Sequence, residues 1–196
     1  MSIKGSSPPH PSRLGRTAPL LFALCLVFGL AAQASAQRRE HLTPEEIELI
    51  RENQVLDART NVFIKAAERR LLSITNPAEA EKNAPKDKEK WGELKGTREE
   101  FFYDIAKILD EAVVNIDDSA EHNPNSPLLR KSLFMLSQEA SKLLPELTRL
   151  RAGVGSESEA DQLDRAIETA QEISDAAKER GVGADDMKVK PAKKDN

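Results

Sequence analysis

The stretch LRKSLFMLSQEASKLLPELTRL, residues 129–150, decides the fold class of this chain. Its apolar side chains recur at alternating steps of four and three residues: Leu129, Leu133, Leu136, Ala140, Leu143, Leu147 and Leu150. This spacing places them on one narrow face of an α-helix, the seam by which helices pack in bundles. Pro145 interrupts the stretch, but the stripe keeps its phase beyond it, so we expect a kink and not a stop.

Ordinary capping and turn residues mark where this helix begins and where the next helix begins and ends. Ser126 is a suitable N-cap and Pro127 suits the first helical position, after an Asn-Pro turn cluster at 123–127. After a Gly-Val-Gly turn, Ser156 and Glu159 form a capping box for another helix, which Gly181 ends. The inward-facing residues predicted for that helix are Ala160, Leu163, Ile167, Ala170, Ile173 and Ala177.

Upstream of the stretch, a first helix begins at a complete start signal. Thr43 is the N-cap, Pro44 stands at N1, and Glu46 closes a capping box, so we expect one long helix from Thr43 to about Ile74. Asn76-Pro77 ends it, because a residue before proline avoids the helical region.

Residues 75–90 contain no large apolar side chain, which predicts an exposed loop that is either a plain connection or a partner contact. A second helix is expected over about 89–119, where apolar residues recur at helical spacing. Gly92 and Gly96 weaken its beginning, and Thr97 with Glu100 offers a fresh capping box.

These segments predict an all-α fold, an up-down antiparallel bundle of about four long amphipathic helices. The expected organisation is a secretory signal peptide at 1–36, a flexible lead-in at 37–42, the helical bundle domain at 43–180, and a disordered tail at 181–196.

The N-terminal segment has the three parts of a secretory signal. Lys4, Arg13 and Arg16 supply positive charge, an apolar stretch of 13 residues follows at 20–32, and Ala34-Ser35-Ala36 offers a cleavage site before Gln37. The apolar stretch is shorter than the roughly 20 residues of a spanning helix. We therefore expect a periplasmic or secreted protein with no membrane span after cleavage; the alternative is an uncleaved N-terminal anchor.

Cleavage changes the chemistry that is available to the chain. The lone cysteine, Cys25, lies in the signal segment, so the mature chain has no thiol for catalysis or metal binding. It retains 26 basic and 33 acidic residues, a net charge of −7. Because nucleic-acid binding depends on neutralising phosphates, we expect no nucleic-acid partner. A protein partner of unknown identity and a homo-oligomer both remain open.

No catalytic, cofactor-binding or metal residue is predicted. His41 and His122 are the two histidines of the mature chain, and neither belongs to a Glu-x-x-His motif or a Cys-x-x-Cys-His motif. The alternative is a metal-dependent bundle, since Asp118 and His122 have the i, i+4 spacing of two zinc ligands.

Two polar or aromatic groups have open interpretations. A cluster in the first helix is either a buried network, a partner groove or a solvated face: Asn53, Gln54, Asp57, Arg59, Thr60 and Asn61. In Phe101-Phe102-Tyr103, Phe101 belongs to the core by phase, Phe102 flanks it, and Tyr103 points elsewhere, so that it is either packed or part of a contact patch.

The segment Leu42-Thr43-Pro44-Glu45-Glu46 resembles the Leu-Thr-x-x-Gln signature of Spy-like periplasmic chaperones, with Glu46 in place of the glutamine. That resemblance implies an exported all-helical protein that holds unfolded clients, although the capping box predicts the same letters.

We predict an exported, non-enzymatic helical protein that acts through protein–protein contacts. The alternatives are a periplasmic chaperone-like protein and a ligand- or metal-binding helical bundle.

Overall fold

The computed structural model describes residues 39–189, and these residues are all-helical. From Glu40 onward these residues belong to one compact unit, which is described below. The predicted signal segment lies outside the described residues. Within these residues no helix is both long enough and apolar enough to cross a bilayer.

Six α-helices form in residues 39–189, more than the four expected. They are α2 (Pro44–Glu52), α3 (Leu56–Thr75), α4 (Pro77–Trp91), α5 (Arg98–His122), α6 (Pro127–Leu150) and α7 (Glu157–Glu179). Two short 3₁₀ helices, η1 (Arg151–Gly153) and η2 (Ala184–Lys188), follow α6 and α7.

The predicted helix starts are confirmed where a capping residue was identified. The Thr43 hydroxyl accepts a hydrogen bond from the Glu46 amide at 3.1 Å, and the Thr43 amide donates to the Glu46 carboxylate at 2.9 Å. Thr97 and Glu100 repeat this reciprocal pair at the start of α5. At α7 the pair is shifted: Ser156 caps the Glu159 amide, but the Glu159 carboxylate accepts from the Gly155 amide.

The prediction of a single helix from 43 to 74 is wrong, because the helix breaks after Glu52. The Asn53 side chain donates to the Leu49 carbonyl at 2.7 Å, and the Gln54 side chain donates to the Arg51 carbonyl. The Leu49 carbonyl also accepts the Asn53 amide, the last ordinary helical bond of α2, whereas the Arg51 carbonyl, which the Val55 amide would use in a continued helix, is taken by the Gln54 side chain. Such side chains compete in this way with helix formation. The chain then restarts as α3 at Leu56.

The prediction of a loop over 75–90 is also wrong. Asn76-Pro77 ends α3 as expected, but Asn76 is also the N-cap of α4, accepting a hydrogen bond from the Glu79 amide at 3.2 Å. Pro77 stands at the first helical position, where its missing amide costs nothing. None of the residues of α4 is buried, so the helix needs no apolar stripe. Its sequence therefore lacks the apolar periodicity from which a helix is predicted.

The remaining boundaries agree with the sequence in part. Trp91 ends α4 and does not begin the next helix, and α5 extends to His122. Pro145 lies inside α6, and the helix continues through it, as predicted. Gly181 takes a left-handed φ of 57° after α7, and the amides of Gly181 and Val182 bond back to the carbonyls of Lys178 and Ala177, a complete Schellman motif.

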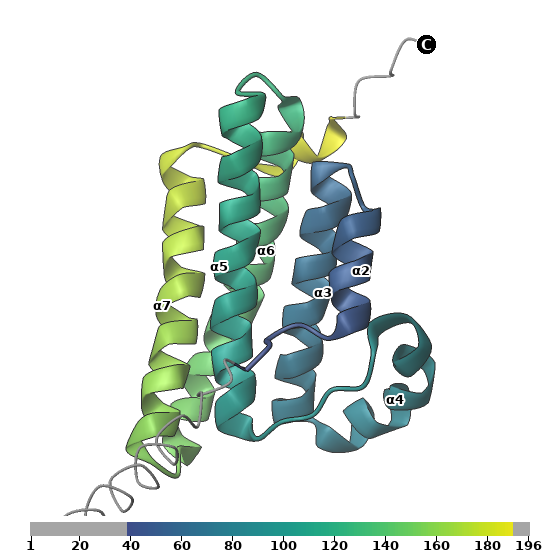
Figure 1. The fold of residues 1–196 in the computed structure, drawn as a ribbon. Coiled ribbons are helices and arrows are strands. Elements are labelled where there is room, and N and C mark those ends of the chain that lie inside the picture. The colour runs from purple at the N-terminus through teal and green to yellow at the C-terminus, as the bar shows by residue number, and fades with distance from the viewer. Residues whose placement is uncertain (1–38, 190–196) are drawn as a thin grey trace, which may run out of the picture. The chain divides into compact units, whose positions relative to one another are not determined.

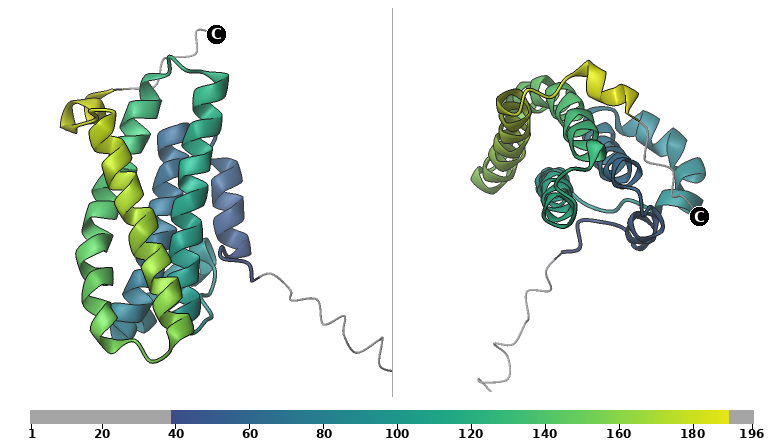
Figure 2. Two further views of the ribbon diagram at one scale, coloured as in Figure 1. Left: turned by 90° about the vertical axis from the view of Figure 1, so that its left-hand side faces the viewer. Right: turned by 90° about the horizontal axis from the view of Figure 1, so that it is seen from above.

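The long helices α3, α5, α6 and α7 surround a common core (Figures 1 and 2), in which α3 packs against α5 and α6, and α7 packs against the same two helices. The consecutive helices α5 and α6 lie opposite each other, whereas a simple up-down bundle places consecutive helices side by side. The fully buried large apolar side chains are Phe102, Ile105, Ile108, Leu109, Leu136, Leu143, Leu147 and Leu163.

The segments expected to be flexible at either end of the domain are held in place where the structure describes them. Leu42 is buried, and the His41 carbonyl accepts a hydrogen bond from Arg70 at 2.7 Å. After α7, η2 packs against α6, and Asp186 pairs with Arg130 at 2.9 Å. The expected disordered tail is therefore wrong for residues 181–189, and its remainder lies outside the described residues.

Candidate functional site

A buried ion cluster joins three helices near the start of α2. The Glu46 carboxylate is fully buried and lies 2.6 Å from the Arg69 guanidinium and 2.7 Å from the Arg70 guanidinium. Arg70 also lies 3.9 Å from Asp104 on α5. Burial lowers the pKa of Arg69, and the nearby Glu46 carboxylate opposes that shift.

Sequence analysis missed this cluster, although a signal was present. Arg70 continues the apolar stripe of α3 at the spacing set by Phe63, Ala67 and Ile74, so it occupies a core position. A charged residue at such a position needs a buried partner of opposite charge. Glu46 was assigned only to the capping box, and it also serves as that partner.

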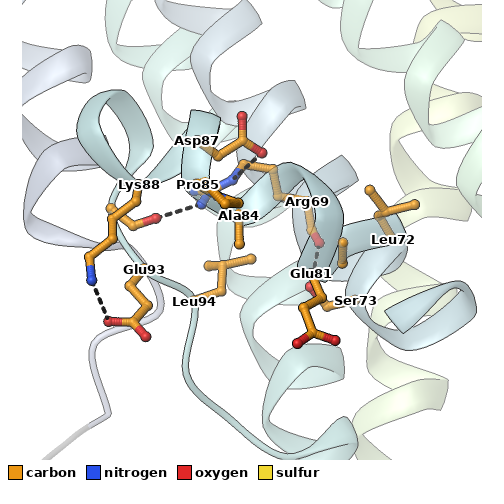
Figure 3. A pocket seen from close by; sticks show the side chains of 12 residues that line it. Arg69, Leu72, Ser73, Glu81, Ala84, Pro85, Asp87, Lys88, Glu93 and Leu94 are labelled. Atoms are coloured by element: carbon orange, nitrogen blue, oxygen red, sulfur yellow. Dashed lines mark hydrogen bonds and ion pairs between the residues drawn. The ribbon is translucent and has the colours of Figure 1, made fainter. Parts of the chain in front are cut away.

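A cavity of about 440 Å³ lies between α3 and α4, beside Arg69 (Figure 3). The Arg69 guanidinium donates to the carbonyls of Trp91 at 2.9 Å and Gly92 at 2.7 Å, and it lies 3.9 Å from Asp87. These contacts tie the end of α4 to α3. Arg69 therefore links α3 to the end of α4 and, through Glu46, to α2; we call this contact region the joint. The guanidinium of Arg69 is already engaged by protein groups.

Gly92 makes this joint possible. It has a left-handed φ of 72°, and a Cβ atom at this position would collide with the Glu45 carboxylate and the Thr43 hydroxyl. The Thr43 hydroxyl donates to the Trp91 carbonyl at 2.6 Å, so the first turn of α2 packs directly on the end of α4.

A larger and more apolar cavity of about 900 Å³ opens between α5, α6 and α7. We call it the apolar groove; its apolar lining residues are Val113, Val114, Ile116, Ala120, Leu129, Leu133, Ile173, Ala176 and Val182. Val114, one of these lining residues, is 56% exposed. The groove has the size and the mostly apolar lining that are typical of binding sites.

Polar contacts show how α5 and α7, which form two walls of the apolar groove, lie against each other. Ser158 donates to Glu99 near the starts of the two helices, and Thr169 donates to Asp110 at 3.4 Å near their middles. Each pair is separated by 59 residues, so the two helices run parallel and in register. A polar cavity of about 390 Å³ continues the apolar groove between the same helices, from Asp110 back to Tyr103.

Three acidic residues (Asp110, Asp117 and Glu172) and two basic residues (Arg130 and Arg180) line the apolar groove. Asp117 and Glu172 line it from opposite walls, and neither side chain has a hydrogen bond or ion pair within residues 39–189. Arg130 also lines it, but its guanidinium is engaged by Asp186 and by the carbonyls of Arg180 and Gly181. The side chain of Arg180 is the unengaged basic group among these described lining residues.

The histidines considered as metal ligands lie in different surroundings. His122 Nδ1 lies 2.7 Å from the Asp118 backbone carbonyl, so the imidazole contacts the main chain of Asp118 and not its carboxylate. His41 Nε2 lies 3.0 Å from a Glu111 carboxylate oxygen. In residues 39–189 no three side chains of His, Cys, Asp or Glu come together as a metal-binding group.

The polar cluster predicted in the first helix does not form one network. Asn53 and Gln54 break the helix, Thr60 is buried and donates to the Leu56 carbonyl, and Asp57 pairs with Lys131 of α6 at 2.6 Å. Arg59 donates to the Asn53 carbonyl, and Asn61 is exposed.

The aromatic group is divided between the core and the surface. Phe101 and Phe102 are buried, with Phe102 the deeper of the two. Tyr103 is half-buried and lines the polar continuation of the apolar groove.

Comparison of the chain with protein-family models, curated proteins and solved structures found no match.

Proposed function

We propose that this chain is an exported, non-enzymatic helical protein that acts by binding another protein, and that the apolar groove is its contact site. The observation that carries the proposal is the concave apolar lining between α5 and α7, with Val114 exposed beside it. A contiguous apolar surface with a polar rim is typical of a protein–protein contact site.

The architecture supports a binding role in a second way. The long helices α3, α5, α6 and α7 act, in this proposal, as a rigid four-helix bundle that presents the groove. Parallel neighbouring helices leave a shallow channel between them, and such channels accept the apolar face of a partner's helix.

Photo-crosslinking in the producing cells tests this function. Replacement of the exposed Val114 with p-benzoylphenylalanine places the reactive group at the groove, and the same replacement at the exposed Ala78 of α4 is the control. We expect discrete crosslinked protein bands from position 114 and none from position 78. Equal labelling at both positions, or no crosslinked protein at either, contradicts the proposal.

Export is tested separately by mass spectrometry of the protein from the envelope fraction. We expect a denatured mass that begins at Gln37, because Ala34-Ser35-Ala36 precedes it as a cleavage site. A full-length mass would instead identify the N-terminal segment as a retained anchor.

A further inference from the structure

We infer that residues 181–189 form a latch that holds the end of α7 against α6 and closes one end of the apolar groove, so that opening of the latch regulates binding there. This inference rests on the proposed function and names a regulation of the same site. Three observations carry it: the path of the latch, the single side chain that holds it, and its weak packing.

The latch begins at the apolar groove and ends on another face of α6. Because α5 and α7 run parallel, their last turns and the first turn of α6 meet at one end of the groove, where Val182 and Arg130 line it. From there the chain crosses beside α6 to the side of α3 (Figures 1 and 2). Met187 of η2 lines a second cavity there, of about 610 Å³, together with Ile64 of α3 and Met135 of α6.

One side chain of α6, that of Arg130, holds the latch. Its guanidinium donates to the carbonyls of Arg180 at 3.1 Å and Gly181 at 2.7 Å, which belong to the end of α7. It also donates to both carboxylate oxygens of Asp186 in η2, at 2.9 and 3.3 Å. The Asp186 carboxylate in turn accepts from the Gly183 amide at 2.8 Å. A single guanidinium therefore ties both the end of α7 and η2 to α6.

Apart from these contacts the latch is weakly packed. No residue of η2 is buried, and Met187, its large apolar side chain, is 44% exposed. The Arg130 side chain is itself about half exposed, so its ion pair with Asp186 is open to water and to salt. A segment with few buried contacts opens at a small cost in free energy. The latch can therefore open while the long helices stay folded.

Opening of the latch changes the apolar groove at its end. Val182 leaves the lining, and the last turn of α7 is no longer tied to Arg130 through its carbonyls. The space that Val182 fills then becomes available to an occupant. An occupant that uses this space binds only open molecules, so its apparent affinity is reduced by the fraction of molecules that are open. The latch is in this way an autoinhibitory contact.

Fluorescence titration of the purified protein with Nile red, an uncharged apolar dye, tests the inference. Arg130→Gln and Asp186→Ala each break the latch, yet they change the net charge in opposite directions. We expect each variant to bind the dye about threefold more tightly, or better, than the unaltered protein, because more molecules are open. Arg149→Gln is the matched control and should leave the affinity unchanged, since Arg149 lies on the same helix in an exposed ion pair with Glu146.

Three results of this titration contradict the inference. Unchanged affinity in both variants would show that the apolar groove does not depend on the latch, and weaker binding in both would make the latch a wall of the groove. Opposite changes in the two variants would trace the effect to charge alone. Addition of Val114→Asp to Arg130→Gln should abolish the gain, and a gain that survives it would lie outside the groove and overturn the inference.

Hydrogen exchange distinguishes opening of the latch from a general loss of stability. In Arg130→Gln, exchange at residues 184–189 should speed up by about fivefold or more, while exchange in α5 and α6 stays unchanged. Equal exchange of these residues in the variant and the unaltered protein, or equal acceleration in α5 and α6, overturns the inference.

The two proposals fail in different ways. If position 114 crosslinks in cells but neither latch variant changes dye binding, this inference fails while the proposed function stands. If both latch variants bind the dye more tightly but position 114 gives no crosslinked protein, the proposed function fails and the latch controls a groove with another occupant.

Discussion

At the residue scale, the Glu46 carboxylate stabilises the fold in two ways. Its carboxylate closes the capping box of α2 and neutralises Arg69 and Arg70. A charge pair that is buried this deeply is costly to break, because the remaining charge loses its partner without regaining water. The ionic link between α2 and the two arginines of α3 therefore depends on one carboxylate.

We expect Glu46→Gln to lower the free energy of unfolding by about 3–5 kcal/mol, since two buried guanidinium groups lose their nearest carboxylate and keep only Asp87 and Asp104, each at 3.9 Å. Urea denaturation followed by circular dichroism measures the change. Glu48→Gln is the matched control: Glu48 pairs with Arg51 at the surface, and exposed pairs contribute about 0–1 kcal/mol. A loss below about 1 kcal/mol in Glu46→Gln would show that the cluster is not a source of stability.

Glu139 on α6 should make stability depend on pH. Burial raises its pKa; nearby Glu68 adds to the rise, and the Lys142 ammonium at 2.9 Å opposes it. The folded protein then binds this proton more tightly than the unfolded chain does, so stability falls as pH rises from the ordinary glutamate pKa through the raised folded one.

We therefore expect the Tm of Glu139→Gln, relative to that of the unaltered protein, to increase as pH rises through this interval. Each unit of pKa difference corresponds to about 1.4 kcal/mol. Thermal melts at a series of pH values measure the difference, and the exposed Glu121→Gln serves as control. A constant difference across the range would mean that Glu139 has the same proton affinity in both states.

At the element scale, α4 is held at its two ends and not along its length. Its N-cap is Asn76, and its last residue, Trp91, is held through its carbonyl by Thr43 and Arg69. None of its residues is buried, and Pro85 lies inside it. A helix with so few packed side chains should open more readily than α5 or α6.

Replacing the cap should open α4 locally. We expect Asn76→Ala to cost about 1 kcal/mol of local stability, since the Glu79 amide loses its acceptor. Hydrogen exchange at residues 79–84 should then speed up by roughly fivefold, while exchange in α5 and α6 stays unchanged. Lys82→Ala, within the same helix, should have no such effect, and equal acceleration in both variants would contradict the capping role.

At the scale of the whole described unit, the buried ion cluster connects the peripheral helices α2 and α4 to the four long helices. Arg69 and Arg70 belong to α3, and their partners lie in α2, in α5 and at the end of α4. We expect these parts to unfold together, as small single domains usually do.

Trp91, the single tryptophan of the chain, allows this cooperativity to be measured. Its ring lies 5.9 Å from the Arg69 guanidinium, so its fluorescence reports on the joint, whereas circular dichroism reports mainly on the long helices. The two urea transitions should coincide in the unaltered protein. In Glu46→Gln the fluorescence transition should come first, and separate transitions in the unaltered protein would contradict a single cooperative unit.

The sequence by itself determined where most helices begin and which faces they bury. The capping hydrogen bonds of Thr43, Thr97 and Ser126 span two or three residues, so they depend on nothing distant in the chain. The stripe along 129–150 likewise settled α6, including its continuation through Pro145. Short-range hydrogen bonds and helical periodicity are properties that a single segment contains in full.

The tertiary structure alone decided the helix α4, the ion cluster and the apolar groove. α4 lacks the apolar stripe that marks a packed helix, and Glu46 meets Arg69 and Arg70 only because α2 folds back along α3. The groove exists because α5 and α7, which are not consecutive, lie side by side with contacts between residues 59 positions apart. Which helix faces meet depends on packing summed over the whole core, and no local pattern in the sequence encodes that choice.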